Sequence, residues 1–116
     1  MKRRLAGLIL LCFCLLGLPN VVLAETAAPQ KVMIITVDDA VEPGLASYLE
    51  RNIAIAKENQ ADLLILELDT PGGRVDAAQE IKRLLYDSGM ETVALVKDQA
   101  LSAGAYIAMC CDKIAM

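Results

Sequence analysis

The stretch that decides the fold reads Thr92-Val93-Ala94-Leu95-Val96 and, a few residues later, Ala100-Leu101-Ser102-Ala103-Gly104-Ala105-Tyr106-Ile107-Ala108-Met109. The first run has the length and the β-branched content of a buried strand. The residues from Ala103 to Cys110 are rich in alanine and contain no proline, which suits a short helix. Ser102 is therefore predicted to lie where a strand turns into a helix, beside free backbone N–H groups and the positive end of the helix dipole.

Two roles are open to Ser102 at such a turn. Its oxygen could attack a carbonyl carbon, because the oxyanion that forms would lie next to the free N–H groups. It could also be only a helix N-cap, since serine is a preferred cap residue. This stretch alone favours the cap.

A second turn changes that balance. Asp69-Thr70-Pro71-Gly72-Gly73-Arg74 also follows an apolar run and precedes a helical pattern. Two adjacent glycines permit positive φ and a close approach to the backbone. Their N–H groups could face a carbonyl oxygen held near Ser102. A Pro-Gly turn without function is the alternative for this motif alone.

The remaining pattern predicts an α/β fold with a parallel sheet. Apolar runs at residues 32–37 and 63–68 predict strands buried on both faces, and residues 112–116 look like the start of another. Between the strands, helices are expected over 45–58 and from residue 75 to a stop at Gly89. Their apolar stripes are Leu45, Leu49, Ile53 and Ala56, and then Val75, Ala78, Ile81 and Leu85. The order β-α-β-α-β-α-β implies right-handed crossovers, with functional sites at the carboxyl ends of the strands.

The N-terminus has the features of a secretory signal peptide over residues 1–24, with an uncleaved membrane anchor as the alternative. Residues 25–31 form a polar spacer, and residues 32–116 the single domain. Removing the first segment takes away three basic residues and no acidic one, so an acidic chain remains. That charge argues against nucleic acid as a partner. The composition and the signal peptide predict a location outside the cytoplasm.

The chain contains no histidine, which excludes a Ser-His-Asp triad and any His-ligated metal within it. Asp38, Asp39 and Asp69 could hold Mg²⁺ at the strand ends, but turn and cap roles are favoured, and we expect no metal and no cofactor. Arg74 is a weak candidate for binding a substrate carboxylate, and an ion pair with Asp76 is preferred.

The two turns together resemble the NfeD-type membrane-bound serine proteases of the Clp protease/crotonase-like superfamily. The resemblance rests on Asp69 to Arg74 and on Ser102 to Ala108, and it covers nearly all of the chain after the signal peptide. It implies that Ser102 is the nucleophile, that Gly73 with Gly72 beside it forms the oxyanion turn, and that the Ala103 N–H is the second donor. It also implies a homo-oligomer with a polypeptide substrate, itself membrane-associated.

The family uses a Ser-Lys dyad whose lysine lies a few tens of residues beyond the serine, and this chain ends before that point. None of its own candidates matches that position: Lys31, Lys57, Lys82, Lys97 and Lys113. We therefore expect an N-terminal fragment of an extracytoplasmic, membrane-associated serine peptidase, with nucleophile and oxyanion hole but no base, inactive alone. A non-catalytic scaffold that binds a membrane partner is the alternative. A crotonase-like acyl-CoA enzyme is disfavoured by the signal peptide, because acyl-CoA is cytoplasmic.

Overall fold

The structure is a computed structural model that describes residues 30–116. The expected signal peptide, residues 1–24, and most of the spacer lie outside the described residues. Seven elements follow one another along the chain. They are β1 (Val32–Val37), α2 (Pro43–Glu58), β2 (Leu63–Thr70), α3 (Val75–Ser88), β3 (Glu91–Ala100), α4 (Ala103–Met109) and β4 (Lys113–Ala115). The predicted alternation of strands and helices is confirmed.

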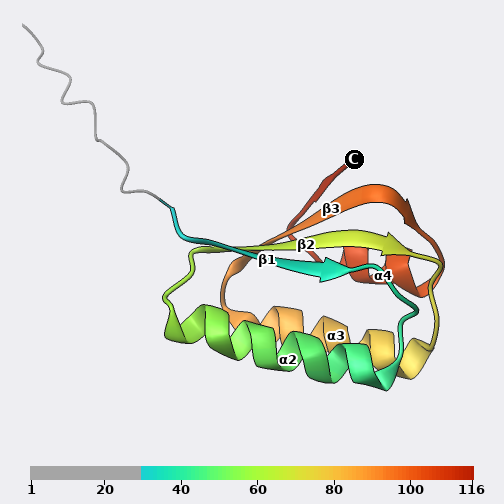
Figure 1. The fold of residues 1–116 in the computed structure, drawn as a ribbon, viewed down its shortest axis with the longest axis horizontal. Helices are drawn as coiled ribbons and strands as arrows, with labels where there is room; N and C mark the ends of the chain where they lie inside the picture. Colours follow the sequence, from blue (N-terminus) through green and yellow to red (C-terminus); the bar gives the residue numbers. More distant parts are fainter. Residues whose placement is uncertain (1–29) are drawn as a thin grey trace, which may run out of the picture.

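The four strands form one parallel sheet in the order β1-β2-β3-β4. Neighbours in the sheet are also neighbours in sequence, so every crossover has the same sense and the helices gather on one face. Figure 1 shows α2 and α3 side by side beneath the sheet, with α4 behind its carboxyl end. The carboxyl ends of β1, β2 and β3 therefore share one edge, where the predicted turns lie.

The core lies between the sheet and the helices. Fully buried side chains from the strands, such as Ile35, Leu66 and Leu68, meet the buried stripe of α2, which contains Leu49 and Ile53. The α3 stripe is confirmed at three of its four predicted positions, Ala78, Ile81 and Leu85. The prediction is wrong for Val75, which is 68% exposed at the first position of the helix.

The prediction that the strands are buried on both faces is wrong for the part of the chain that the structure describes. Alternate β1 residues point away from the helices, and Val32 and Ile34 are 45% and 55% exposed. All three helices cover the opposite face, so nothing within residues 30–116 covers this one (Figure 1). An uninterrupted apolar run does not distinguish a strand covered once from a strand covered twice.

Strand β3 is longer than predicted and continues through Ala100 instead of ending at Val96. Its pairing with β2 shifts on the way: Leu68 pairs with Val96, but Thr70 pairs with Ala100. Four steps along β3 thus oppose two steps along β2, so two β3 residues are taken up in an irregularity of the bulge type. The shift brings Ser102 level with the glycine turn that follows Thr70.

The start of β4 is tied to the start of β3 by a reciprocal set of hydrogen bonds. The N–H and hydroxyl of Thr92 donate to Asp112 Oδ2 at 2.8 and 2.7 Å, and the Asp112 N–H donates to Thr92 Oγ1 at 3.0 Å. Thr92 is buried. These hydrogen bonds, from the Thr92 hydroxyl first and its N–H second, hold the pKa of Asp112 below its usual value.

Adjacent isoleucines of β1 test which face carries the core. Ile35 is 1% exposed and Ile34 is 55% exposed. Ile35→Ala should lower the free energy of unfolding by about 3 kcal/mol, since it leaves a cavity, and Ile34→Ala by under about 1 kcal/mol. Urea unfolding of the whole chain in a mild detergent, followed by circular dichroism, measures both. Equal losses would contradict the one-sided core.

Asp112 should make stability depend on pH. Its pKa is lower in the folded chain than in the unfolded chain, so its contribution is complete above the ordinary aspartate pKa of about 3.9 and is lost as the pH falls through the folded value. Asp112→Asn should therefore lower the melting temperature at pH 7 and have a smaller effect near pH 2. A mutant-to-native difference that is the same at both pH values would argue against this linkage.

Candidate active site

The two predicted turns are in contact. A Cβ placed on Gly72 would lie 2.6 Å from the Leu101 carbonyl oxygen, 3.0 Å from Ser102 Cβ and 3.3 Å from the Ala103 nitrogen. Such distances leave no room for any side chain at residue 72. The glycine is therefore required by the close approach of two backbones that are far apart in sequence. The structure brings Gly72 against Ser102 and Ala103, and Gly73 follows Gly72 in the same turn and lies against Val41.

Ser102 has an unusual backbone conformation, with φ 50° and ψ −112°. The Gly104 N–H donates to the Leu101 carbonyl at 2.8 Å, which closes a turn with Ser102 as its first central residue. Those dihedrals match a type II′ turn, in which this position is dominated by glycine. A side chain here costs of order 1–3 kcal/mol, and such strain gathers at functional sites. The turn is a sharp strand-to-helix corner of the kind that presents a nucleophile.

The Ser102 side chain is exposed and makes no capping hydrogen bond to α4, although the residue occupies the N-cap position. A serine kept for capping would have extended φ and ψ and would accept a bond from the first turn of the helix. Ser102 has neither feature. The cap interpretation therefore leaves both the strain and the free hydroxyl unexplained.

Two backbone amides are left over beside Ser102. Among the hydrogen bonds of residues 30–116, neither the Gly73 N–H nor the Ala103 N–H has an acceptor. The C=O and N–H of a trans peptide point in opposite directions. The Gly72 carbonyl accepts from the Val41 N–H on the β1 side at 2.8 Å, so the Gly73 N–H points toward the β3 side, where Ser102 lies. The Ser102 carbonyl likewise accepts from Tyr106 along α4, so the Ala103 N–H points out of the helix start.

The Gly72 N–H is not free. It donates to Thr70 Oγ1 at 3.1 Å in a buried hydrogen bond. Of the two glycines in the predicted oxyanion turn, Gly73 is thus the one with an amide available for a ligand. The role of Gly72 that the contacts support is steric, because its missing side chain lets the turn approach Ser102.

Two buried residues at this edge were missed by the sequence reasoning. Val41, with 0% exposure, brackets the glycine turn: its N–H donates to Gly72 and its carbonyl accepts from the Arg74 N–H at 2.7 Å. Thr70, also 0% exposed, bonds both the preceding loop and the turn. A polar residue at an inward position of a strand, as Thr70 is, was the available signal.

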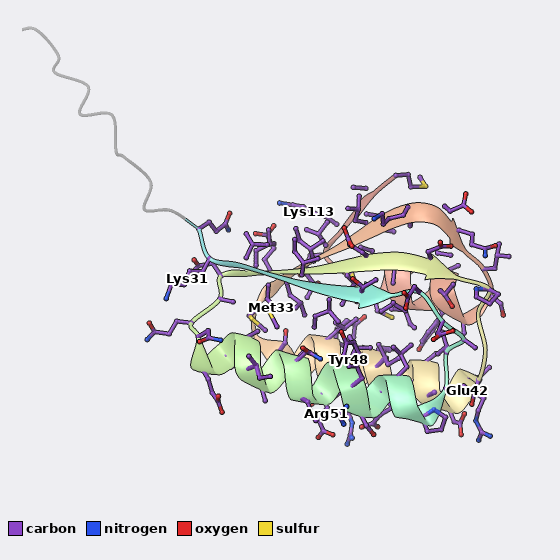
Figure 2. The ribbon with its side chains drawn as sticks, viewed as in Figure 1. Lys31, Met33, Glu42, Tyr48, Arg51 and Lys113 are labelled. Atoms are coloured by element: carbon purple, nitrogen blue, oxygen red, sulfur yellow. The ribbon has the colours of Figure 1, made fainter. Side chains whose placement is uncertain are left out.

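The lysines of the described chain are engaged elsewhere. Lys97 Nζ lies 3.9 Å from Glu67 on the open face of the sheet, and Lys113 pairs with Glu91 there. Figure 2 shows Lys113 on the side of the sheet away from the helices, and Lys31 at the opposite end from Glu42. Lys57 donates to the Asp87 carbonyl, and Lys82 lies over the rings of Tyr86 and Tyr106.

Arg74 forms the surface ion pair that the sequence favoured. Its Nε and a terminal nitrogen bond the two Asp76 oxygens at 2.9 and 2.6 Å. The bond from Arg74 lowers the pKa of Asp76 to about 2.

Within residues 30–116, no three side chains of the types that ligate metals come together. Burial raises the pKa of the Cys111 thiol to about 11, so it is not a thiolate nucleophile.

A hollow of about 420 Å³ lies next to the Ser102 turn, between the end of β3, α4 and β4. Its lining is largely apolar and includes Leu101, Met109 and Ile114, which are 54%, 69% and 48% exposed. A larger hollow, lined by acidic residues of the loop after β1, lies between that loop and α2. The apolar hollow is the one whose lining includes Leu101, the residue directly before Ser102. No helix among residues 30–116 has the length and apolar character to cross a bilayer.

Comparison with known proteins agrees with this geometry. The family described as "NfeD1b, N-terminal domain" matches residues 31–116. The Membrane protein NfeD1b of Bacillus subtilis is 45% identical over 107 residues, which are 92% of this chain and 24% of that protein. The Membrane-bound protease PH1510 of Pyrococcus horikoshii is 33% identical over the whole chain, which covers 25% of that protein. The chain thus spans about a quarter of these relatives.

Solved structures give the same grouping. A serine-to-alanine mutant of the 1510-N membrane-bound stomatin-specific protease superposes with a TM-score of 0.70 at 31% identity, over 75% of this chain and 44% of that chain. ClpP1 of Listeria monocytogenes shares the fold, with a TM-score of 0.64 at 15% identity over 67% of this chain and 46% of that one. The predicted ClpP-like fold is confirmed. With a family match over residues 31–116 and a protease-like arrangement of parallel strands, the chain belongs to the NfeD1b N-terminal domain family.

Proposed function

We propose that this chain is the nucleophile-bearing part of a serine peptidase, with Ser102 as the nucleophile and the Gly73 and Ala103 amides as the oxyanion hole. The observation that carries the proposal is the exposed, strained Ser102 at a corner where two amides, those of Gly73 and Ala103, have no acceptor among residues 30–116. A structural serine gains nothing from this conformation, because glycine would adopt it at lower cost.

The chemistry that fits this arrangement is acyl transfer. Ser102 Oγ attacks the peptide carbonyl carbon, its proton passes to a base, and the carbonyl oxygen becomes an anion that accepts hydrogen bonds from Gly73 and Ala103. The C–N bond then breaks as the base returns the proton to the leaving amine, and water releases the acyl group. Each amide donor in such a hole is worth about 10²–10³ in rate.

A lysine outside the described residues is the base in this proposal. The five described lysines have partners on other elements or over aromatic rings, and none is paired with Ser102. The structure of the related 1510-N protease was solved with a substrate peptide as a lysine-to-alanine mutant, and separately as a serine-to-alanine mutant. Serine and lysine are the residues that a Ser-Lys dyad requires.

The substrate we propose is an apolar, extended polypeptide at a membrane. The hollow beside Ser102 is lined by Leu101, Met109 and Ile114, so it suits an apolar side chain. The relatives are named membrane proteins, and one is named for a stomatin substrate. Membrane association, an extracytoplasmic position and a homo-oligomer belong to the same proposal. The non-catalytic scaffold remains the alternative if Ser102 is unreactive.

A peptidyl boronic acid with a terminal leucine-like side chain tests the nucleophile and the donors without needing the base. The Ser102 oxygen bonds to boron, its proton passes to the buffer, and the boron becomes a tetrahedral anion that resembles the intermediate. We expect a tetrahedral boron NMR signal with the whole chain in mild detergent. Ser102→Ala should abolish the signal, and the exposed control Ser47→Ala should keep it.

We expect no peptide cleavage by the same samples, because none of the five described lysines is paired with Ser102. A Ser102-dependent cleavage would place a base within this chain. A boron signal that stays trigonal, or that survives Ser102→Ala, would favour the scaffold.

Ser102→Gly tests the strain. Glycine adopts the φ and ψ of residue 102 freely, so the free energy of unfolding should rise by about 1 kcal/mol in spite of glycine's larger unfolded-state entropy. Ser102→Ala should not give this gain, because alanine keeps the Cβ. Both variants should lose the boronate adduct. Equal urea midpoints for the glycine and alanine variants would show that the turn stores no strain.

A further inference from the structure

We infer that Thr70 is a positioning residue whose hydroxyl aims the Gly72–Gly73 turn at Ser102. This inference rests on the proposed function, since it names the group that holds the oxyanion donor of Gly73 in place. Thr70 touches no substrate in the proposal. It acts through the turn that begins one residue later.

The Thr70 hydroxyl joins two of the loops at the carboxyl edge of the sheet. Oγ1 donates to the Asp39 carbonyl at 2.7 Å and accepts from the Gly72 N–H at 3.1 Å. Asp39 belongs to the loop after β1, and Gly72 to the turn after β2. The Thr70 side chain is 0% exposed and its bond to Gly72 is buried, so water does not compete for that bond.

The Thr70 backbone and methyl group join the third loop. The Thr70 carbonyl accepts from the Leu101 N–H at 3.0 Å, immediately before Ser102. A Cβ placed on Gly104 would lie 2.5 Å from Thr70 Cγ2, so the first turn of α4 packs directly on this residue. Thr70 is thus in contact with the loops after β1, β2 and β3.

The hydroxyl is the part that orients the donor. Two hydrogen bonds restrain the backbone of Gly72. Its N–H donates to Thr70 Oγ1, and its carbonyl accepts from the Val41 N–H. The Gly72 carbonyl and the Gly73 N–H belong to one peptide plane, so fixing Gly72 at both ends fixes the direction of the Gly73 N–H. Gly72 has φ 97° and no side chain of its own to restrain it. Without the hydroxyl, one of the two restraints disappears.

The variants Thr70→Ser and Thr70→Ala differ by one oxygen atom and give a matched test. Both lack the methyl group that packs on Gly104, and only serine keeps the hydroxyl. Valine is the poorer probe, because a methyl in place of Oγ1 would lie about 2.7 Å from the Asp39 oxygen. The readout is the affinity of the whole chain for the peptidyl boronic acid, together with the amide NMR shifts of Gly73 and Ala103.

We expect Thr70→Ala to weaken boronate binding tenfold or more and to shift the NMR signal of the Gly73 amide. An N–H that no longer points at the boronate oxygen cannot donate a hydrogen bond to it. Thr70→Ser should bind within threefold of the native chain. Ile53→Val, a core change on α2, should lower stability and leave the affinity unchanged. That control separates positioning from simple loss of stability.

The outcomes separate the two proposals. If Thr70→Ala and Thr70→Ser bind the boronate equally, the positioning role is overturned while the proposed function stands. If the native chain forms no Ser102-dependent adduct, the proposed function fails first. Should Thr70→Ala fail to fold, Thr70→Ser still tests the inference. A tenfold loss of boronate affinity in Thr70→Ser, which keeps the hydroxyl, would assign the effect to the methyl group and contradict the positioning role of the hydroxyl.

Discussion

The contact between Gly72 and the Ser102 turn is the constraint on which the candidate site depends. It brings a turn after β2 within van der Waals distance of a turn after β3. Parallel strands that are adjacent in both sheet and sequence make such a meeting possible, because their carboxyl ends share an edge. The register shift between Leu68 and Thr70 completes it, because two extra β3 residues are taken up before Ala100 pairs with Thr70. A regular ladder would place Ser102 two residues further along, opposite Arg74 instead of Gly72.

The strain at Ser102 has to be offset by the rest of the fold. A non-glycine residue at positive φ persists only where the surrounding structure determines it. Here the Leu101 N–H is held by Thr70 on one side, and the following helix packs on Thr70 through Gly104 on the other. Buried side chains between sheet and helices supply the favourable free energy. The strained corner therefore lies at the edge of a well-packed core, where the rigid sheet and helices meet solvent.

Much of this could be predicted from the sequence, because the signals were local. The apolar runs and helical stripes predicted the element order, and the two turn motifs predicted the corner where Gly72 lies against Ser102 and Ala103. What could not be predicted depends on tertiary contacts. Val75 fits the helical stripe but is exposed at the first position of α3, and the Gly72 amide is bound by Thr70 in a buried hydrogen bond. The one-sided burial of β1 follows from the placement of all the helices on one face.

On the proposed function, there is a physical reason why the nucleophile and the oxyanion donors lie in this fold and the general base does not lie among the described residues. The nucleophile and both donors come from backbone corners of consecutive β-α units, so local sequence and one register shift suffice to assemble them. A base differs in kind, because a lysine must lose solvation or gain a neighbouring cation before it is neutral near pH 7. Among the described lysines, Lys97 and Lys113 are paired with acids on the open face, and Lys82 lies over two tyrosine rings. The part of the site that depends on backbone geometry is thus complete in this fold, and the part that depends on burial of a charge is what remains to be supplied.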